Sequence, residues 1–168
     1  AGTVHCSGAD TMVLEISATP YIFTFKLWDW GRVDLDGKPR PIHLEHGAAN
    51  IQWYRNTEWV HRNLVNAVAE VYTGENGTVV RTGLHEREFL DTFRFTTSSA
   101  LPVHRNGSVH MLNLVDGTRA VLRSKSDAFL PLELHYAETC IVPQAAGDYE
   151  IYSPDGSEVK VILACVRN

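Results

Sequence analysis

Residues 28–40 combine aromatic, acidic and basic side chains around a predicted turn. The basic residues Arg32, Lys38 and Arg40 flank this turn together with Asp29, Asp34 and Asp36. A guanidinium can hold a phosphate through two hydrogen bonds, and a lysine beside it can stabilise a developing oxyanion. The same charge pattern is also typical of a surface hairpin held by salt bridges. The segment therefore predicts either a site for an anionic ligand or a solvated hairpin.

Histidine and glutamate residues recur at spacings that could bind a metal ion. His5 lies near the start of the chain, while His43 with Glu45 and Glu133 with His135 have the i, i+2 spacing that places two side chains on one face of a strand. A catalytic zinc ion needs about three protein ligands. Each of these groups supplies fewer, so a surface or satisfied buried role stays open beside the metal-binding role.

Overall composition limits the classes of function. The chain has 168 residues, 44% hydrophobic residues and a formal net charge of -5, so it can bury a real core and lacks the basic surface that nucleic acids require. No apolar stretch approaches the roughly 18 residues of a membrane span, and no leader pattern is present. We therefore expect a cytoplasmic protein that binds neither nucleic acid nor membrane. The odd set of three cysteines predicts no disulfide framework.

Tight-turn dipeptides divide the chain into short segments rich in β-branched and aromatic residues. Asn-Gly or Asp-Gly occurs at positions 36–37, 76–77, 106–107, 116–117 and 155–156, and this pattern predicts an all-β fold of the sandwich or barrel type. The predicted strands are residues 11–16, 22–27, 68–73, 79–82, 89–96, 109–114, 120–123, 139–143, 149–152 and 159–166.

Helices are predicted to be minor and the chain to contain two modules. Short helical turns are expected at residues 46–52 and 127–130, and residues 51–59 read as an irregular connector. Residues 61–168 are long enough for a complete β-barrel, whereas residues 1–60 hold about two clear strands and look like the end of something larger.

Several motifs taken together resemble the type I mannose-6-phosphate isomerases (phosphomannose isomerases) of the cupin superfamily. The motifs are GTVH at 2–5, VLEI at 13–16, FKLWDWGRVD at 25–34, DGKPR at 36–40, HLE at 43–45 and LELHYAET at 132–139. The resemblance implies cupin-type jelly-roll barrels, with residues 1–60 as the end of the first, catalytic barrel and a connector, and residues 61–168 as a complete second cupin-like barrel.

The resemblance also implies an activity and a set of site residues. Enzymes of this family interconvert mannose 6-phosphate and fructose 6-phosphate with the help of zinc. By motif, His5 matches a zinc ligand, Arg32 the active-site arginine and Asp29 an acidic residue of the same pocket, while Lys38 is a substrate contact. The residue that transfers the proton stays unassigned.

The family's other zinc ligands lie upstream of the motif that begins this sequence. We therefore expect this chain to be a C-terminal portion that is inactive alone, with an incomplete zinc site and with self-association through the incomplete first barrel. Two alternatives stay open. One is a module that binds sugar phosphate through Arg32 without chemistry, and the other is a purely structural second barrel.

Overall fold

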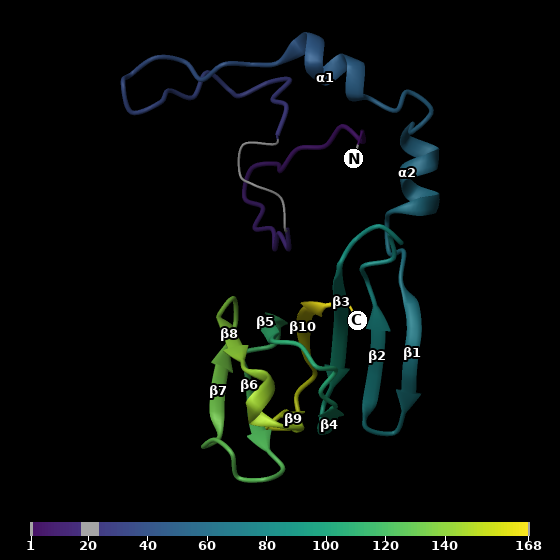
Figure 1. Cartoon of the computed structure of the whole chain (residues 1–168), viewed down its shortest axis with the longest axis vertical. Coiled ribbons are helices and arrows are strands. Elements are labelled where there is room, and N and C mark those ends of the chain that lie inside the picture. Colours follow the sequence, from purple (N-terminus) through teal and green to yellow (C-terminus); the bar gives the residue numbers. More distant parts are fainter. Residues whose placement is uncertain (1, 18–23, 168) are drawn as a thin grey trace. The chain divides into compact units, whose positions relative to one another are not determined.

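The computed structural model describes residues 2–17 and 24–167, so the predicted strand at residues 22–27 lies partly outside the described residues. The chain divides into two compact units, residues 1–65 and residues 66–168. The boundary that we expected after residue 60 falls inside a helix, α2 (Thr57–Asn63). Each unit is described by itself (Figure 1).

The second unit consists of two antiparallel sheets, as Figure 1 shows. One sheet has the strand order β1-β2-β3-β10-β5-β8 and the other has the order β4-β9-β6-β7. The predicted all-β fold is confirmed. The strands are β1 (Ala69–Gly74), β2 (Gly77–Arg81), β3 (Leu90–Thr97), β4 (Ala100–Val103), β5 (His110–Asp116), β6 (Arg119–Ser124), β7 (Leu132–His135), β8 (Thr139–Val142), β9 (Tyr149–Tyr152) and β10 (Val159–Val166), with a short 3-10 helix η1 (Gln144–Ala146) before β9.

Side chains from both sheets fill the space between them. Leu112, Leu122 and Ile151 are completely buried, and Tyr149 joins them with its ring in the core. Burying one large aliphatic or aromatic side chain contributes about 1.5–3 kcal/mol, so this layer supplies most of the unit's stability. The sandwich is therefore a rigid frame for any side chain that its strands carry.

One close backbone approach and one β-bulge shape the hairpin of β1 and β2. Gly77 has φ +134°, and a Cβ placed there would lie 2.1 Å from the carbonyl oxygen of Thr96. Only glycine permits the turn after β1 to lie so close to β3. In β1, the pairing with β2 shifts between Glu70 and Tyr72, which marks a β-bulge in this edge strand.

The first unit differs from the two strands that we predicted for it. Residues 11–16 form no strand, because they pair with no other described segment. The unit instead contains α1 (Leu44–Asn50), close to the helical turn expected at residues 46–52, and α2. Asn56 caps α2 by accepting a hydrogen bond from the Trp59 backbone N–H at 2.9 Å, so part of the expected connector is helical.

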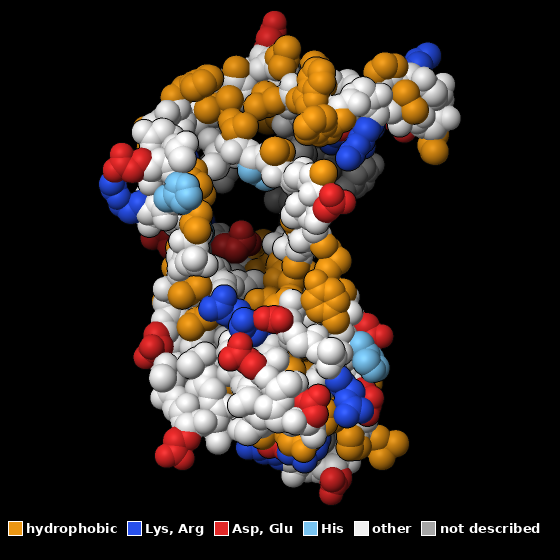
Figure 2. Space-filling view, turned by 180° about the vertical axis from the view of Figure 1, so that it is seen from behind, with side chains coloured by type: hydrophobic (Ala, Val, Ile, Leu, Met, Phe, Trp, Pro, Cys, Tyr) orange, Lys and Arg blue, Asp and Glu red, His pale blue; other side chains and the backbone are white. Residues whose placement is uncertain are grey.

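Few side chains of the first unit are buried. Among its described residues only Asp29 and Gly47 are classed as buried, and hydrophobic side chains lie at its surface (Figure 2). All four tryptophans of the chain, Trp28, Trp30, Trp53 and Trp59, belong to this unit. Within the described residues, no helix is long and apolar enough to cross a membrane.

Candidate functional site

The predicted turn at residues 28–40 is a two-stranded hairpin. Val33 pairs with Pro39, and the Asp34 N–H donates to the carbonyl oxygen of Lys38 at 2.8 Å. On the other side of that pair, the Arg40 N–H donates to the carbonyl oxygen of Arg32 at 3.1 Å. Because side chains two residues apart share a face of a strand, this register places Arg32, Lys38 and Arg40 on one face of the hairpin, together with the carboxylate of Asp34.

A tight turn at the base of the hairpin sets the position of Arg32. The Arg32 N–H donates to the carbonyl oxygen of Asp29 at 2.9 Å, and the two residues between them, Trp30 and Gly31, have φ values of +56° and +67°. Positive φ at both central positions is the signature of a type I′ turn. An aromatic residue rarely adopts this conformation, and such strain, about 1–3 kcal/mol, tends to occur at functional sites.

Helix α1 supports the segment that enters this turn. The His43 N–H donates to the carbonyl oxygen of Lys26 at 2.7 Å, and the Lys26 N–H donates to His43 Nδ1 at 3.2 Å. The Phe25 ring stacks on His46 with 5.9 Å between the ring centres. His43 therefore links α1 to the segment at residues 25–26.

Asp29 and Arg40 form a bidentate ion pair. Arg40 Nε donates to Asp29 Oδ2, and Arg40 Nη2 donates to Asp29 Oδ1, both at 2.5 Å. Asp29 is only 8% exposed. The hydrogen bonds from Arg40 hold the pKa of the Asp29 carboxyl below its ordinary value, and the same bonds raise the pKa of Arg40. Both groups are therefore charged and fixed, and Asp29 has its oxygens directed at Arg40.

Arg32 and Lys38 are exposed beside this pair. The described part of the chain gives the Arg32 guanidinium no hydrogen bond or ion pair. Lys38 Nζ lies 3.7 Å from Asp36 Oδ2, and its side chain is 81% exposed. An exposed ion pair of this length contributes little, so Lys38 can turn to another anion. The hairpin thus presents Arg32 and Lys38 next to the fixed Arg40, with the carboxylate of Asp34 on the same face.

His5 lies apart from any set of metal ligands that the described residues provide. Its Nδ1 is 3.0 Å from the carbonyl oxygen of Thr3, and the side chain is exposed. Residues 2–17 and 24–167 contain no cluster of three His, Cys, Asp or Glu side chains able to hold a metal ion. The described residues therefore give His5 no set of three ligands for the zinc ion that the family resemblance implies.

A second site, which the sequence analysis missed, lies between the sheets of the second unit. A cavity of about 390 Å³ is lined by apolar side chains, including Val79, Phe93 and Leu163, and by His104, Asn106 and His110. His110 is 2% exposed, and its Nδ1 lies 2.9 Å from the Tyr149 hydroxyl. His110, Leu112 and Leu114 lie two residues apart in a predicted strand, and this spacing is the signal that would have placed His110 on the buried face.

Hydrogen bonds fix the chemical state of His110. Its Nε2 lies 3.1 Å from Asn106 Oδ1, and that oxygen also accepts from the Ser108 backbone N–H at 3.2 Å. The Asn106 oxygen is thus an acceptor, so His110 carries its proton on Nε2 and accepts the Tyr149 proton at Nδ1. Burial, with a smaller contribution from the charge of Arg105, lowers the pKa of His110 to about 4. The imidazole is neutral at pH 7.

Comparison with family models and with curated proteins found no match. Solved structures do match. The mannose 6-phosphate isomerase from Bacillus subtilis has 13% sequence identity and a TM-score of 0.59, and the match covers 83% of this chain and 39% of that enzyme. This chain therefore spans well under half of that isomerase's length, and identity at this level shows the fold alone.

Two other solved structures match this chain with lower TM-scores. A putative mannosephosphate isomerase from Archaeoglobus fulgidus has 18% identity and a TM-score of 0.43, covering 52% of this chain and 26% of that protein. A Cupin 2 conserved barrel domain protein from Salinispora arenicola has 11% identity and a TM-score of 0.45, covering 57% of this chain and 80% of that protein. The antiparallel two-sheet barrel of this chain is a cupin fold.

Proposed function

From the cupin fold and the cationic hairpin, we propose that this chain is the C-terminal portion of a mannose-6-phosphate isomerase. The hairpin at residues 28–40 is its contribution to a sugar-phosphate site. The observation that carries this proposal is the exposed guanidinium of Arg32 beside the Asp29–Arg40 ion pair. Similarity in fold to the Bacillus subtilis isomerase supports it.

In this proposal, Arg32 is the residue that contacts the substrate. Its fixed backbone position and available guanidinium suit it to bind an oxyanion, either the phosphate or the enediolate that forms when a proton moves between C1 and C2. Lys38 adds a second, more mobile cation. Asp29 acts through Arg40, because its oxygens are already engaged, so we assign it a positioning role.

None of the roles that we assign to residues of this chain uses a zinc ion. His5 lacks partners for a three-ligand set among the described residues, so we propose that the chain alone does not turn over substrate. A coupled assay for conversion of mannose 6-phosphate to fructose 6-phosphate, with added zinc and with a chelator, tests this statement. Turnover that the chelator abolishes would contradict it.

Binding of mannose 6-phosphate tests the site separately from turnover. Isothermal titration of the full chain should show saturable binding, and R32A should weaken it about tenfold or more, because a charge-assisted contact is worth about 1.5–3 kcal/mol. K38A should weaken it less. R62A, which removes an exposed arginine from α2, is the matched control and should leave binding unchanged. Equal affinity of R32A and the unchanged chain would refute the site.

A binding module without chemistry is the second candidate. The arrangement that favours it is the same hairpin face, which supplies cations but no identified base for proton transfer. Supplying the missing half of an isomerase barrel in trans distinguishes the two functions. Restored turnover that R32A removes supports the isomerase, whereas binding without restored turnover supports the module.

The exposed hydrophobic side chains of the first unit also support a proposal about assembly. We propose that this unit covers them by association with a second copy of the chain in the cytoplasm. Trp28 and Trp53 are 67% and 76% exposed, respectively. Light scattering across a range of concentrations should show a mass that rises toward that of a dimer. A constant monomeric mass would contradict the proposal.

A further inference from the structure

We propose that the barrel of the second unit has its own binding site, separate from the sugar-phosphate hairpin, for a small uncharged and mainly apolar molecule that carries one hydroxyl or N–H group. The site is the cavity of about 390 Å³ between the two sheets. This volume lies in the range of about 300–1,000 Å³ typical of small-molecule sites.

Strands of the rigid sandwich form the walls of this cavity. Phe93 and Phe95 on β3 and Leu101 on β4 face it from the two sheets, and Val71 and Tyr72 line it at the bulge of β1. Val71 is 56% exposed and Tyr72 is 45% exposed, so the cavity is open to solvent on the side of β1. An apolar molecule that enters it removes these walls from water, which is the main source of binding free energy.

The polar groups inside the cavity favour an uncharged ligand. His110 is neutral and has both ring nitrogens hydrogen-bonded, to Tyr149 and to Asn106. Cys165 accepts a hydrogen bond from Asn106 Nδ2 at 3.2 Å, and burial raises the pKa of its thiol, so it carries no charge at pH 7. A charged ligand would lose its hydration without gaining an opposite charge from these groups.

His104 supplies the polar contact of the site. It lies at the mouth of the cavity, where its side chain is 74% exposed, and its Nδ1 lies 2.7 Å from Asp148 Oδ2. The other oxygen of Asp148 accepts from the Arg105 backbone N–H at 2.9 Å, so the carboxylate is fixed in place. A neutral imidazole that donates from Nδ1 to this carboxylate presents Nε2 as an acceptor, and the proposal places this tautomer at the site. That acceptor selects a ligand with a hydroxyl or N–H donor.

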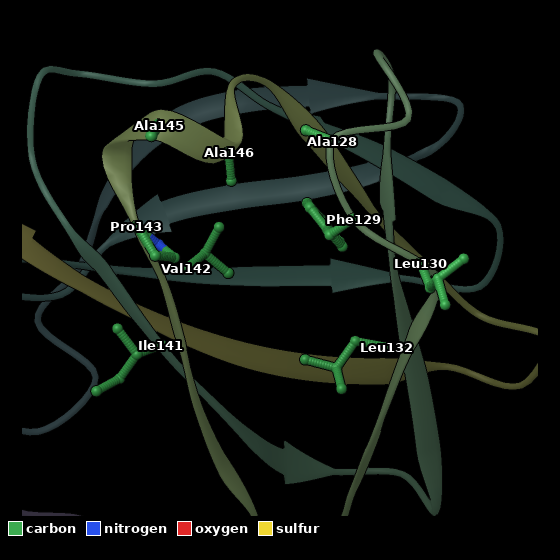
Figure 3. A pocket seen from close by; sticks show the side chains of 9 residues that line it. All are labelled: Ala128, Phe129, Leu130, Leu132, Ile141, Val142, Pro143, Ala145 and Ala146. Atoms are coloured by element: carbon green, nitrogen blue, oxygen red, sulfur yellow. The ribbon is translucent and has the colours of Figure 1, made fainter.

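A different apolar depression on the same unit provides an internal comparison. Figure 3 labels the residues that line this groove, among them Phe129, Leu132, Ile141 and Val142, which come from the segment before β7 and from β7 and β8. Its volume is about 440 Å³. Its lining contains no histidine, carboxylate or other charged side chain. It therefore lacks the selecting group that His104 gives the cavity, and it serves as the control surface.

Fluorescence of N-phenyl-1-naphthylamine, an uncharged aromatic amine with one N–H donor, tests the site on the full chain. We expect saturable enhancement with one molecule bound per chain. V71W places a large ring at the wall of the cavity and should weaken binding more than tenfold. T73W on the same strand and I141W in the groove should leave binding unchanged. Absence of saturable binding, or loss of binding in I141W instead of V71W, would overturn the proposal.

The role of His104 requires a second comparison. H104A should weaken binding of the amine about fivefold, the change expected for one neutral hydrogen bond. It should not change binding of 1-phenylnaphthalene, which has a similar shape and no donor. Equal losses for both probes would refute the contact with His104. If V71W melts at a lower temperature than the unchanged chain, the smaller V71F replaces it, and retained full affinity in V71F would then count against the cavity.

Discussion

The buried His110 should make the stability of the barrel depend on pH in a defined window. Its pKa is about 4 in the folded chain, whereas an exposed histidine has a pKa of about 6.5. Between these two values the unfolded chain binds the proton more strongly. The free energy of unfolding should therefore fall as the pH falls from about 6.5 to about 4, and it should be fully present above that window.

The size of this effect follows from the two pKa values. Each pH unit is worth about 1.36 kcal/mol per proton, so the complete difference is about 3 kcal/mol, of which about 2 kcal/mol falls between pH 6.5 and 4.5. The physical cause is that a proton on the ring must be buried with no carboxylate beside it, and near the positive charge of Arg105. The Tyr149 hydroxyl must also reverse its hydrogen bond to the ring.

Urea unfolding followed by far-ultraviolet circular dichroism measures this dependence. The variant H110Q keeps a polar side chain at the position and does not titrate. Carboxylates such as Asp116 and Asp148, whose pKa values are lowered by their hydrogen bonds, titrate in the same way in both proteins and cancel in the comparison. The unchanged chain should lose about 2 kcal/mol more than H110Q between pH 6.5 and 4.5. Parallel losses in the two proteins would refute the reasoning.

Three further changes test the packing, the turns and the hairpin. L122A removes a completely buried side chain and should lower the free energy of unfolding, measured in urea, by about 2–5 kcal/mol. L130A, at a residue that is 87% exposed, should lower it by less than about 0.5 kcal/mol. Similar losses in the two variants would contradict the assigned core. G77A places a Cβ 2.1 Å from a carbonyl oxygen and should clearly lower the melting temperature of the barrel. G156A places a Cβ that meets no atom within 4 Å and should lower the melting temperature less. The reverse order would contradict the turn geometry. D29N removes the charge that holds its arginine partner, so the Nε–H of that arginine should exchange faster with solvent in nuclear magnetic resonance spectra, and unchanged exchange would argue against the ion pair.

Much of the barrel could be predicted because its strands carry a clear period of two. In β10, Val159, Val161 and Leu163 are buried and the residues between them are half-buried. Two strands escaped prediction. Pro102 interrupts β4 and is tolerated there because β4 is at the edge of its sheet. In β7 the polar pair Glu133 and His135, which left a ligand set and a satisfied polar pair both open, lies on the solvent face of the strand.

The first unit was harder to predict because long-range pairing and local strain decide its structure. Residues 11–16 have a strand-like composition but no partner strand among the described residues, and composition alone cannot supply one. The contact between Asp29 and Arg40 depends on a turn in which Trp30 takes a conformation that its residue type disfavours. The residues of the hairpin could be named from the sequence, but their pairing could not. The roles given to Arg32, Lys38 and His5 stay predictions.

The distribution of aromatic residues makes the two units spectroscopically distinct. Every tryptophan lies in residues 1–65, whereas the barrel holds the buried Tyr149 and no tryptophan. Emission excited at the red edge, where tyrosine does not absorb, therefore follows the first unit alone. Near-ultraviolet dichroism combines the tryptophans and Tyr54 of the first unit with the buried Tyr149 of the barrel, so a change in this signal without a change in the red-edge emission reports the barrel. One sample, observed with these two signals, can reveal whether the units lose their structure in one transition or in two, without any label or truncation of the chain.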